Sequence, residues 1–539
     1  MAQIRARIWM DDAALPEREL AELEARPSTG LCLSGGGTRA TCAAIGYLRG
    51  LLELGLLDRL RYTSAVSGGS WASVPYSYWR SGAASDAELL GPILAPESLD
   101  RATLEAPMPD AYLGAAATRS FRDSLFDDLR GEGPGRAWIS AAGETFLEPW
   151  GLYAADAPRS YTWSEATRDA ILERQAELAG GSSLGVDDFV CARRGRPYPI
   201  VTATALGPAI GDNLARLDPM AFEFTPLYAG VRVGREHGYA YKRGGELRRL
   251  VGGGVVEPIA LGGAGPGYLG DAARQDVTLE RGERLSDLAF AIGASSCAYG
   301  SVMTESVPTL GSGHGRVPQA RYWPVRRGDV PTSVDWEFGD GGTIDNFGLF
   351  ALLQREVETI IVLVNTKQKL SVGWNPGEGS YQPHIDPYLP PLFGVHEDRA
   401  AIALQRNQVF PREEFDGFVA ALQAAKLDEG PTIVVCEHRV VDNAWWGIRG
   451  DRSVRICWVY LDRVPRFEAR LPRATAAAIE LGNKRVAGGP FQRFPNYETI
   501  GANRFSLVRF TPGQVRLLAN LCAWTVLDQR AVFESLLLG

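Results

Sequence analysis

The stretch from residue 30 to residue 71 constrains the fold of this chain more than any other. It predicts an apolar strand ending at Leu33, a glycine turn, a helix over Ala40–Leu54 and a second strand over Tyr62–Val66. Gly55 is well placed to end the helix. A strand–helix–strand unit of this kind is right-handed almost without exception, with its two strands parallel. Both turns that follow the strands are therefore expected at the carboxyl edge of one sheet, where α/β sheets place their ligands.

Ser67 lies where the second strand meets two glycines and the start of a helix. A strand–turn–helix of this kind holds a serine in a strained conformation with its hydroxyl exposed, and it needs small neighbours. The usual pattern is Gly-x-Ser-x-Gly, whereas here Ala65 stands in place of the first glycine, and Gly68 and Gly69 follow the serine. Because alanine is also small, the pattern is compatible with a nucleophilic serine, and an ordinary turn is the alternative.

Three consecutive glycines, Gly35, Gly36 and Gly37, follow the first strand. Glycines let backbone N–H groups approach a ligand closely, and the helix that follows adds its positive end. Such donors can hold the oxyanion formed in acyl transfer if they face the nucleophile. A nucleotide phosphate loop is the alternative, but it requires Gly-Lys-Ser/Thr or Gly-x-Gly-x-x-Gly spacing, and here Thr38 and Arg39 follow. The sequence therefore favours an oxyanion loop.

A second chemical signal is Asp340, which stands before Gly341 and Gly342 at the end of a strand-like stretch over 334–339. A helix comes next, and then a continuous apolar strand over 358–364, which is typical of a parallel sheet covered on both faces. An Asp-Gly-Gly sequence is usually only a turn. Together with the serine turn and the glycine loop, it makes Asp340 the leading candidate for a general base.

The composition excludes several classes of function. Hydrophobic residues make up 45% of the 539 positions and charged residues 22%, as in an ordinary globular chain. The net charge of −8 gives no support to nucleic-acid binding. The seven cysteines show no paired spacing, so we expect free thiols in a reducing compartment. Because neither Cys-x-x-Cys nor His-Glu-x-x-His occurs, we expect no metal site.

Residues 1–28 are expected to form an N-terminal extension with mixed charge and a short helical segment around Glu17–Ala25. The extension has no apolar core of the signal-peptide type, and no later apolar run is long enough to cross a bilayer. We therefore expect a cytoplasmic protein without a transmembrane segment. If its substrate is a lipid, the protein must meet that lipid at a membrane surface.

Between residues 81 and 195 the alternation of strands and helices is lost, and prolines and aromatic residues interrupt the chain. This stretch is expected to be an insertion that acts as a lid or cap, since lids commonly cover water-sensitive sites. The alternative is a subdomain whose aromatic residues, such as Trp138, Trp150 and Trp163, fill its own core.

The alternation resumes with strands over 196–205 and 221–226, and a helix packed through small residues is expected over 285–301. Residues 252–270 and 304–333 are expected to be loops. In the C-terminal region we expect a surface helix over 412–427, strands over 432–436 and 455–461, and closing helices over 512–538 with a buried apolar stripe.

In their order along the chain, these motifs resemble the patatin and cytosolic phospholipase A2 superfamily, on the side of the cytosolic phospholipases and the fungal phospholipases B. The resemblance covers residues 28–370 and rests on the segments Ser34–Ala40, Val66–Trp71, Tyr198–Ile200, Phe222–Pro226, Gly293–Ser296 and Asp340–Gly342. It implies a three-layer α/β/α fold with a mainly parallel central sheet. The catalytic domain would span 29–370, with the insertion at 81–195, and residues 371–539 would pack on it.

The resemblance also implies a Ser-Asp dyad without histidine, metal or cofactor. Ser67 would attack an ester carbonyl, Asp340 would take its proton, and the N–H groups of Gly36 and Gly37 would hold the oxyanion. Arg39 would meet the substrate phosphate, because its planar fork suits phosphate oxygens, and a salt bridge at the sheet edge is the alternative role. Gly35, Gly68, Gly69 and Gly341 would support these turns. Because few residues precede the glycine loop, we expect no counterpart of the family's calcium-binding membrane module.

A dyad is compatible with the five histidines, which all lie outside the glycine motifs: His237, His314, His384, His396 and His438. A Ser-His-Asp triad is the alternative, with His237 and His314 as candidates because they lie between the serine and aspartate motifs. The implied activity is hydrolysis of phospholipid or lysophospholipid esters. An acyltransferase that uses the same serine, and a non-enzymatic lipid-binding protein that keeps the fold, are the other hypotheses.

Overall fold

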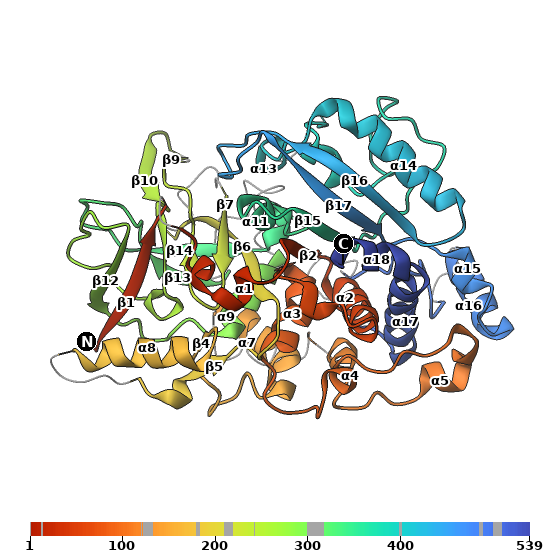
Figure 1. Ribbon diagram of the computed structural model, residues 1–539, viewed down its shortest axis with the longest axis horizontal. Coiled ribbons are helices and arrows are strands. Elements are labelled where there is room, and N and C mark those ends of the chain that lie inside the picture. Colours follow the sequence, from red (N-terminus) through yellow and green to blue (C-terminus); the bar gives the residue numbers. More distant parts are fainter. Residues whose placement is uncertain are drawn as a thin grey trace. The chain divides into compact units, whose positions relative to one another are not determined.

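The computed structural model describes residues 2–11, 14–119, 121, 133–178, 184–209, 219–241, 243–298, 317–397, 402–484, 489–499 and 509–538 (Figure 1). The chain divides into two compact units. The first unit consists of Met1–Ala25, Ser77–Arg80 and Asp123–Ile344. The second unit consists of Arg26–Tyr76, Ser81–Arg122 and Asp345–Gly539.

The strands of the second unit are mainly parallel. Their order is β3 (Tyr62–Val66), β2 (Thr29–Leu33), β15 (Thr359–Val364), β17 (Arg452–Tyr460) and β16 (Thr432–Val440), and only β16 runs antiparallel to its neighbour. Strands β2 and β3 are completely buried, which explains why their sequences lack charged residues and do not alternate between polar and apolar positions. The predicted parallel strand–helix–strand unit is present, and both of its turns open at the same edge.

Helix α2 (Gly37–Glu53) joins these two strands and begins three residues before its predicted start. Gly55, with φ 68°, follows its last turn as expected. The helix packs on α17 (Pro512–Asp528) through glycine: a methyl group at Gly46 would stand 2.2 Å from the Ala519 carbonyl oxygen. Figure 1 shows α2 and α17 on one side of the strands and α11 (Leu349–Gln354) and α14 (Phe415–Leu427) on the other.

Further helices of the second unit are short. Trp71 of α3 (Ser70–Tyr78) stacks on Phe121, with ring centroids 6.1 Å apart. The others are α4 (Asp86–Leu89), α5 (Arg101–Glu105), α12 (Leu389–Leu392), α13 (Ile402–Gln405), α15 (Pro465–Glu468), α16 (Arg473–Asn483) and α18 (Arg530–Leu537).

A buried histidine links α14 to the antiparallel edge of this sheet. His438 Nδ1 lies 2.7 Å from Glu414 Oε2, and Trp458 donates its indole N–H to His438 Nε2 at 3.1 Å. The ring also stacks on Phe410, with centroids 4.7 Å apart. Since Nε2 accepts a hydrogen bond, it carries no proton, and burial lowers the pKa of His438 although Glu414 opposes the shift.

This histidine should make the second unit less stable in mild acid. Because the folded-state pKa lies below 6.5, the stabilisation is complete above pH 6.5 and is lost as the pH falls through the folded value. We expect the unfolding free energy of the wild type to fall more between pH 7.5 and pH 5.5 than that of His438→Gln. Urea unfolding at both pH values measures these free energies, with His384→Gln as the control. If the unfolding free energies of the wild type and His438→Gln depend equally on pH, the prediction is wrong.

The strands of the larger sheet in the first unit are antiparallel. Their order is β12 (Arg274–Glu280), β1 (Gln3–Met10), β11 (Gly254–Val256), β8 (Ala229–Gly230), β7 (Met220–Phe224) and β6 (Tyr198–Pro208). Strand β6 also pairs with β14 (Val334–Gly339), and β14 pairs with β13 (Gln319–Tyr322). The predicted α/β class is confirmed, since helices and strands are both present and the strands that carry the serine and glycine turns are parallel.

Smaller elements complete the first unit. Helix α9 (Leu288–Ser296) packs through the small residues that predicted it: Ser295 donates to the Thr202 carbonyl on β6 at 2.7 Å, and Gly293 lies against Ile139 of α7 (Pro134–Phe146). Other elements are α1 (Ala21–Glu24), α8 (Glu165–Ala176), the parallel pair β4 (Ser160–Thr162) and β5 (Phe189–Cys191), and the hairpin of β9 (Arg235–Ala240) and β10 (Glu246–Val251).

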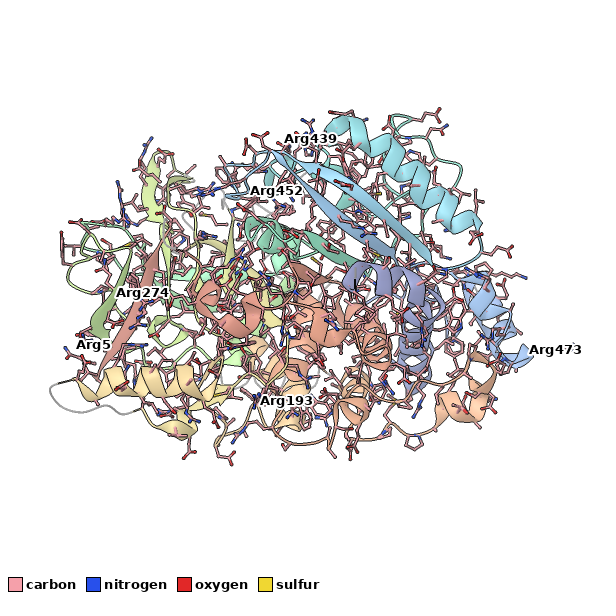
Figure 2. All side chains as sticks on the ribbon, in the orientation of Figure 1. Arg5, Arg193, Arg274, Arg439, Arg452 and Arg473 are labelled. Carbon is pink, nitrogen blue, oxygen red and sulfur yellow. The ribbon has the colours of Figure 1, made fainter. Side chains whose placement is uncertain are left out.

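The N-terminal residues correct the sequence interpretation. Strand β1 lies within the sheet and pairs with β12 over seven residues, so residues 3–10 are not an extension with only a short helix. Ile4, Ala6 and Ile8 are completely buried, while Arg5 and Arg7 between them are half-buried. Figure 2 shows Arg5 and Arg274 on these two adjacent strands. The alternation was a signal for a half-buried strand.

Two predicted loops also contain strands. Residues 252–270 include β11, and residues 317–333 include β13, although 304–316 lie outside the described residues. Both strands are short and flanked by glycine or proline, so their pairing comes from tertiary contacts rather than from local preference. Within the predicted insertion, the segment up to 122 belongs to the second unit and the rest to the first. Trp138, Trp150 and Trp163 are buried, which favours a core role for these aromatic residues.

No helix among the described ranges is both long and apolar enough to cross a membrane. All seven cysteines are unpaired, as their spacing predicted.

Candidate active site

Ser67 occupies a strained bend at the end of β3. It is the first residue of a short 3-10 turn, Ser67–Gly69, that leads into α3. Its φ of 51° lies in the left-handed region that non-glycine residues seldom adopt. The Ser70 hydroxyl donates to the Ser67 carbonyl at 2.6 Å and holds the bend. This is the strand–turn–helix bend that the sequence predicted, and strain of this kind is concentrated at functional sites. Ser67 is buried, however, with 6% exposure, whereas the sequence pattern predicted an exposed hydroxyl.

The glycines after Ser67 are required by close contact with the glycine loop. A methyl group at Gly68 would stand 2.1 Å from the Gly37 carbonyl oxygen, and one at Gly69 would stand 2.1 Å from the Leu33 carbonyl oxygen. The Thr41 hydroxyl on α2 donates to the Gly68 carbonyl at 2.8 Å. The structure thus brings the serine turn and the glycine loop into direct contact.

The glycine loop leaves two backbone donors unused. The N–H of Gly35 donates to the Asn346 carbonyl at 2.8 Å. Gly36 and Gly37 have φ values of 134° and 56°, and neither of their N–H groups makes a hydrogen bond within the described ranges. Both stand at the N-terminus of α2, where unpaired N–H groups favour negative charge. They are available to an anionic oxygen.

Arg39 is buried rather than open to solvent, with an exposure of 5%. Its Nε donates to the Asn365 carbonyl at 3.1 Å and its Nη1 to the Tyr497 carbonyl at 2.6 Å. Its Nη2 lies over the glycine loop, because a methyl group at Gly36 would stand 2.6 Å from it. Burial lowers the pKa of Arg39 to about 10, so the side chain stays charged at neutral pH. Both of its hydrogen bonds run to backbone carbonyls rather than to a carboxylate.

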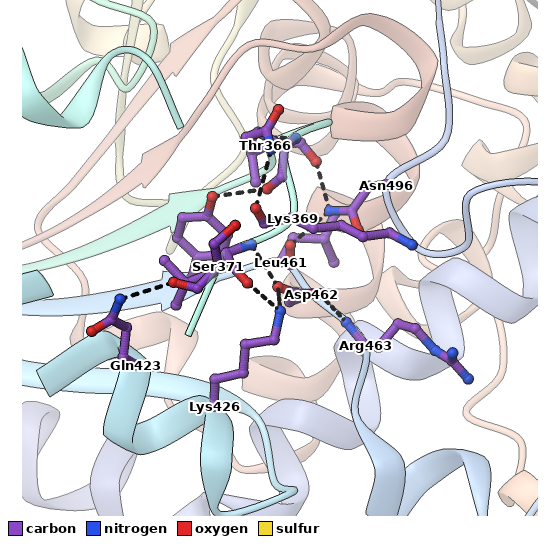
Figure 3. A network of polar contacts seen from close by, with 12 residues as sticks. Thr366, Lys369, Ser371, Gln423, Lys426, Leu461, Asp462, Arg463 and Asn496 are labelled. Atoms are coloured by element: carbon purple, nitrogen blue, oxygen red, sulfur yellow. Dashed lines mark hydrogen bonds and ion pairs between the residues drawn. The ribbon is translucent and has the colours of Figure 1, made fainter. Parts of the chain in front are cut away.

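The loop that binds Arg39 is itself tied to the C-terminal part of the second unit (Figure 3). Asn496 donates to the carbonyls of Thr366 and Leu461 at 3.1 and 2.8 Å. Lys426 of α14 pairs with the buried Asp462, which also accepts the Leu370 N–H at 2.9 Å. Asn365 in turn donates its N–H to the Ser34 hydroxyl at 2.9 Å, next to the glycine loop. Residues far apart in sequence therefore fix this loop.

Asp340 lies in the first unit, one residue after β14, with Gly341 and Gly342 in the turn that follows. Its carboxylate accepts the Gly342 N–H at 2.8 Å. Its backbone is fixed on both sides, because its N–H donates to the Cys297 carbonyl at 3.0 Å and its carbonyl accepts the Thr204 hydroxyl at 2.8 Å. The predicted aspartate turn at a strand end is present.

The histidine alternative gains no support from its two candidates. His237 lies on β9 with 3% exposure, and its ring packs against Tyr239 at a centroid distance of 5.7 Å. His314 lies outside the described residues. In the described part of the chain, no group of three or more His, Cys, Asp or Glu side chains could hold a metal ion.

The sequence interpretation missed two residues beside the glycine loop, Asp345 and Asn346. The buried Asp345 carboxylate accepts the N–H groups of Phe347, Gly348 and Phe350 at 3.1, 3.1 and 2.7 Å and thereby starts α11. Burial raises the pKa of Asp345 to about 6, although these backbone donors oppose the shift. An aspartate four residues before an apolar helix was the signal, since such a side chain can accept backbone N–H groups at the start of a helix.

Fold and site together define an α/β protein with a strained serine at a strand–turn–helix bend, in contact with a loop whose glycine N–H groups are unused.

No family model matches the chain. Cytosolic phospholipase A2 zeta of Mus musculus is 46% identical over 200 residues, which cover 36% of this chain and 19% of that protein. Cytosolic phospholipase A2 delta of Homo sapiens is 37% identical over 141 residues, which cover 25% of this chain and 14% of that protein.

The chain is thus similar to cytosolic phospholipases A2, and the resemblance predicted from its motifs is confirmed. The matched stretches span less than a fifth of these relatives. Among solved structures, human GIVD cytosolic phospholipase A2 aligns with 97% of this chain and 63% of its own, at 14% identity and a TM-score of 0.45.

Proposed function

We propose that this chain is a lipid acyl hydrolase that cleaves carboxylic esters of phospholipids or lysophospholipids. One observation carries the proposal: Ser67 stands at a strained bend in direct contact with a glycine loop whose Gly36 and Gly37 N–H groups are unused. The sequence similarity to cytosolic phospholipases A2 supports the lipid ester as the substrate class. The protein would meet this substrate at a lipid surface.

In the proposed reaction, Ser67 Oγ attacks the ester carbonyl carbon while Asp340 takes the hydroxyl proton. The carbonyl oxygen becomes an oxyanion, which the N–H groups of Gly36 and Gly37 stabilise. When the intermediate collapses, the ester C–O bond breaks and the leaving alkoxide takes the proton from Asp340. Water then attacks the acyl-serine in the same way, so that the fatty acid leaves and Ser67 recovers its proton. Neither metal nor cofactor takes part in this scheme.

Arg39 contributes through its Nη2 in this proposal. Two of its donors are committed to backbone carbonyls, and these bonds aim Nη2 over Gly36. Because the guanidinium stays charged at neutral pH, it stabilises negative charge on a substrate that lies across the loop. In a phospholipid substrate, this negative charge would be that of the phosphate group.

Incubation with phospholipid vesicles labelled in the acyl chain tests the proposal. We expect release of labelled fatty acid from phospholipid, lysophospholipid or both. A parallel reaction with an acceptor alcohol separates hydrolysis from acyl transfer, because an acyltransferase would yield the labelled ester of the alcohol. Binding to vesicles without either product would contradict the proposal and indicate a lipid-binding protein.

A further inference from the structure

Asn346 lies between the glycine loop and the serine bend. A methyl group at Gly35 would stand 2.4 Å from Asn346 Oδ1 and 3.2 Å from the Ser67 Cβ. The Asn346 side chain and the Ser67 side chain therefore flank the same point on the loop. This contact explains why the first of the three glycines carries no side chain.

The backbone around Asn346 is held rigidly on three sides. Its carbonyl accepts the Gly35 N–H at 2.8 Å. On its N-terminal side, the buried Asp345 carboxylate accepts the N–H of Phe350 in the first turn of α11 at 2.7 Å. On its C-terminal side, Gly348 adopts φ 76° and lies so close to β3 that a methyl group there would stand 2.7 Å from the Ser64 hydroxyl oxygen. The backbone contacts, rather than the Asn346 side chain, therefore hold this segment in place.

The side chain of Asn346, by contrast, has no structural partner. It is half-buried between two buried neighbours, and within the described ranges its carboxamide makes no hydrogen bond. A carboxamide carries two N–H donors and one acceptor oxygen, and a half-turn of the group exchanges the donor and acceptor ends. An N–H of Asn346 can thus face the space next to Ser67.

We infer that the Asn346 carboxamide is a third donor to the substrate oxygen that gains charge when Ser67 attacks, beside the N–H groups of Gly36 and Gly37. This inference rests on the proposed function, because it needs Ser67 as the nucleophile. The favoured ligand is the oxyanion, since the carboxamide lies against the residue that precedes these two donors. Side-chain amides are effective donors of this kind, because a preorganised group needs no reorganisation during the reaction.

Two variants separate the donor from the shape of the side chain. Asn346→Asp keeps the shape and loses both N–H donors, whereas Asn346→Ala loses the whole group. We expect kcat for phospholipid hydrolysis to fall on the order of 10²-fold in both, with KM nearly unchanged, because the interaction forms only in the transition state. The rate of labelling by a fluorophosphonate should fall in parallel, since its phosphoryl oxygen takes the place of the oxyanion. Asn346→Gln, which keeps the donors, should recover part of both rates.

The outcomes distinguish this inference from the proposed function. If the wild type is labelled at Ser67 and both variants react at the wild-type rate, Asn346 is not a donor and the proposed function stands. If Asn346→Asp keeps full activity while Asn346→Ala loses it, shape matters rather than donation, and the inference is wrong. If the wild type is labelled nowhere, the nucleophile itself is wrong. Thermal unfolding should give closely similar midpoints for wild type and variants, since the backbone bond to Gly35 remains.

Discussion

Ser67→Ala should abolish hydrolysis of phospholipid esters and labelling by a fluorophosphonate, with the fold unchanged. The expected loss of kcat is on the order of 10⁴-fold or more, because the substitution removes the nucleophile while the glycine donors remain. Alanine fits the bend sterically as serine does, so the φ of 51° costs both residues a similar amount. Mass spectrometry of the labelled peptide, together with circular dichroism, checks both parts of the prediction.

Ser73→Ala is the matched control. Ser73 lies on the same helix α3, is 1% exposed, and its hydroxyl has no hydrogen-bond partner within the described ranges. The control should keep its activity and its labelling. Persistent labelling of a folded Ser67→Ala variant would remove Ser67 as the nucleophile.

Asp340→Asn should stop turnover almost as completely, because a serine hydroxyl at neutral pH needs an adjacent base. Asparagine keeps an oxygen that accepts the Gly342 N–H, so the turn after β14 should remain formed. We expect a loss of kcat on the order of 10³-fold or more and an unchanged unfolding midpoint. Steady-state hydrolysis of a soluble ester and thermal unfolding provide the two measurements.

Two controls show whether the effect belongs to this carboxylate. Asp335→Asn makes the same chemical change on β14, the strand that precedes Asp340, at a half-exposed position 3.6 Å from Arg321, and it should leave activity intact. The five histidines, replaced one at a time, should each leave substantial activity. If one histidine variant is folded and as inactive as Asp340→Asn, the mechanism is a triad rather than a dyad.

The parallel strands and their turns were predictable because their signals are local. A continuous apolar run, a glycine turn and a helix of core-facing spacing specify the segment of β2, α2 and β3 without knowledge of distant residues. The N-terminal strand β1 was equally local, since Ile4, Ala6 and Ile8 alternate with polar positions. The prediction failed there because the mixed charge of this segment is also typical of a solvated extension, and only pairing with β12 distinguishes the two.

The partners of Arg39 were not predictable from the sequence. The sequence suggested a substrate phosphate or a salt bridge at the sheet edge for Arg39, and it gave no sign of the contacts that the structure shows within the protein, which are the backbone carbonyls of Asn365 and Tyr497. Every residue carries a carbonyl, so no side-chain pattern marks the ones that a fold will use. For the same reason the sequence did not indicate Asn346, whose backbone carbonyl accepts the Gly35 N–H of the glycine loop. Contacts of this type become visible only in three dimensions.

The distance along the chain between Arg39 and Tyr497 has a consequence for synthesis. The carbonyl that binds Nη1 is made 458 residues after the arginine, which takes roughly 20 to 90 s at the usual rate of translation. During that time the nascent chain can form β2, α2 and β3 around Ser67, but the guanidinium over the glycine loop lacks this partner. The loop under the guanidinium should therefore reach its final geometry only after residue 497 has been made.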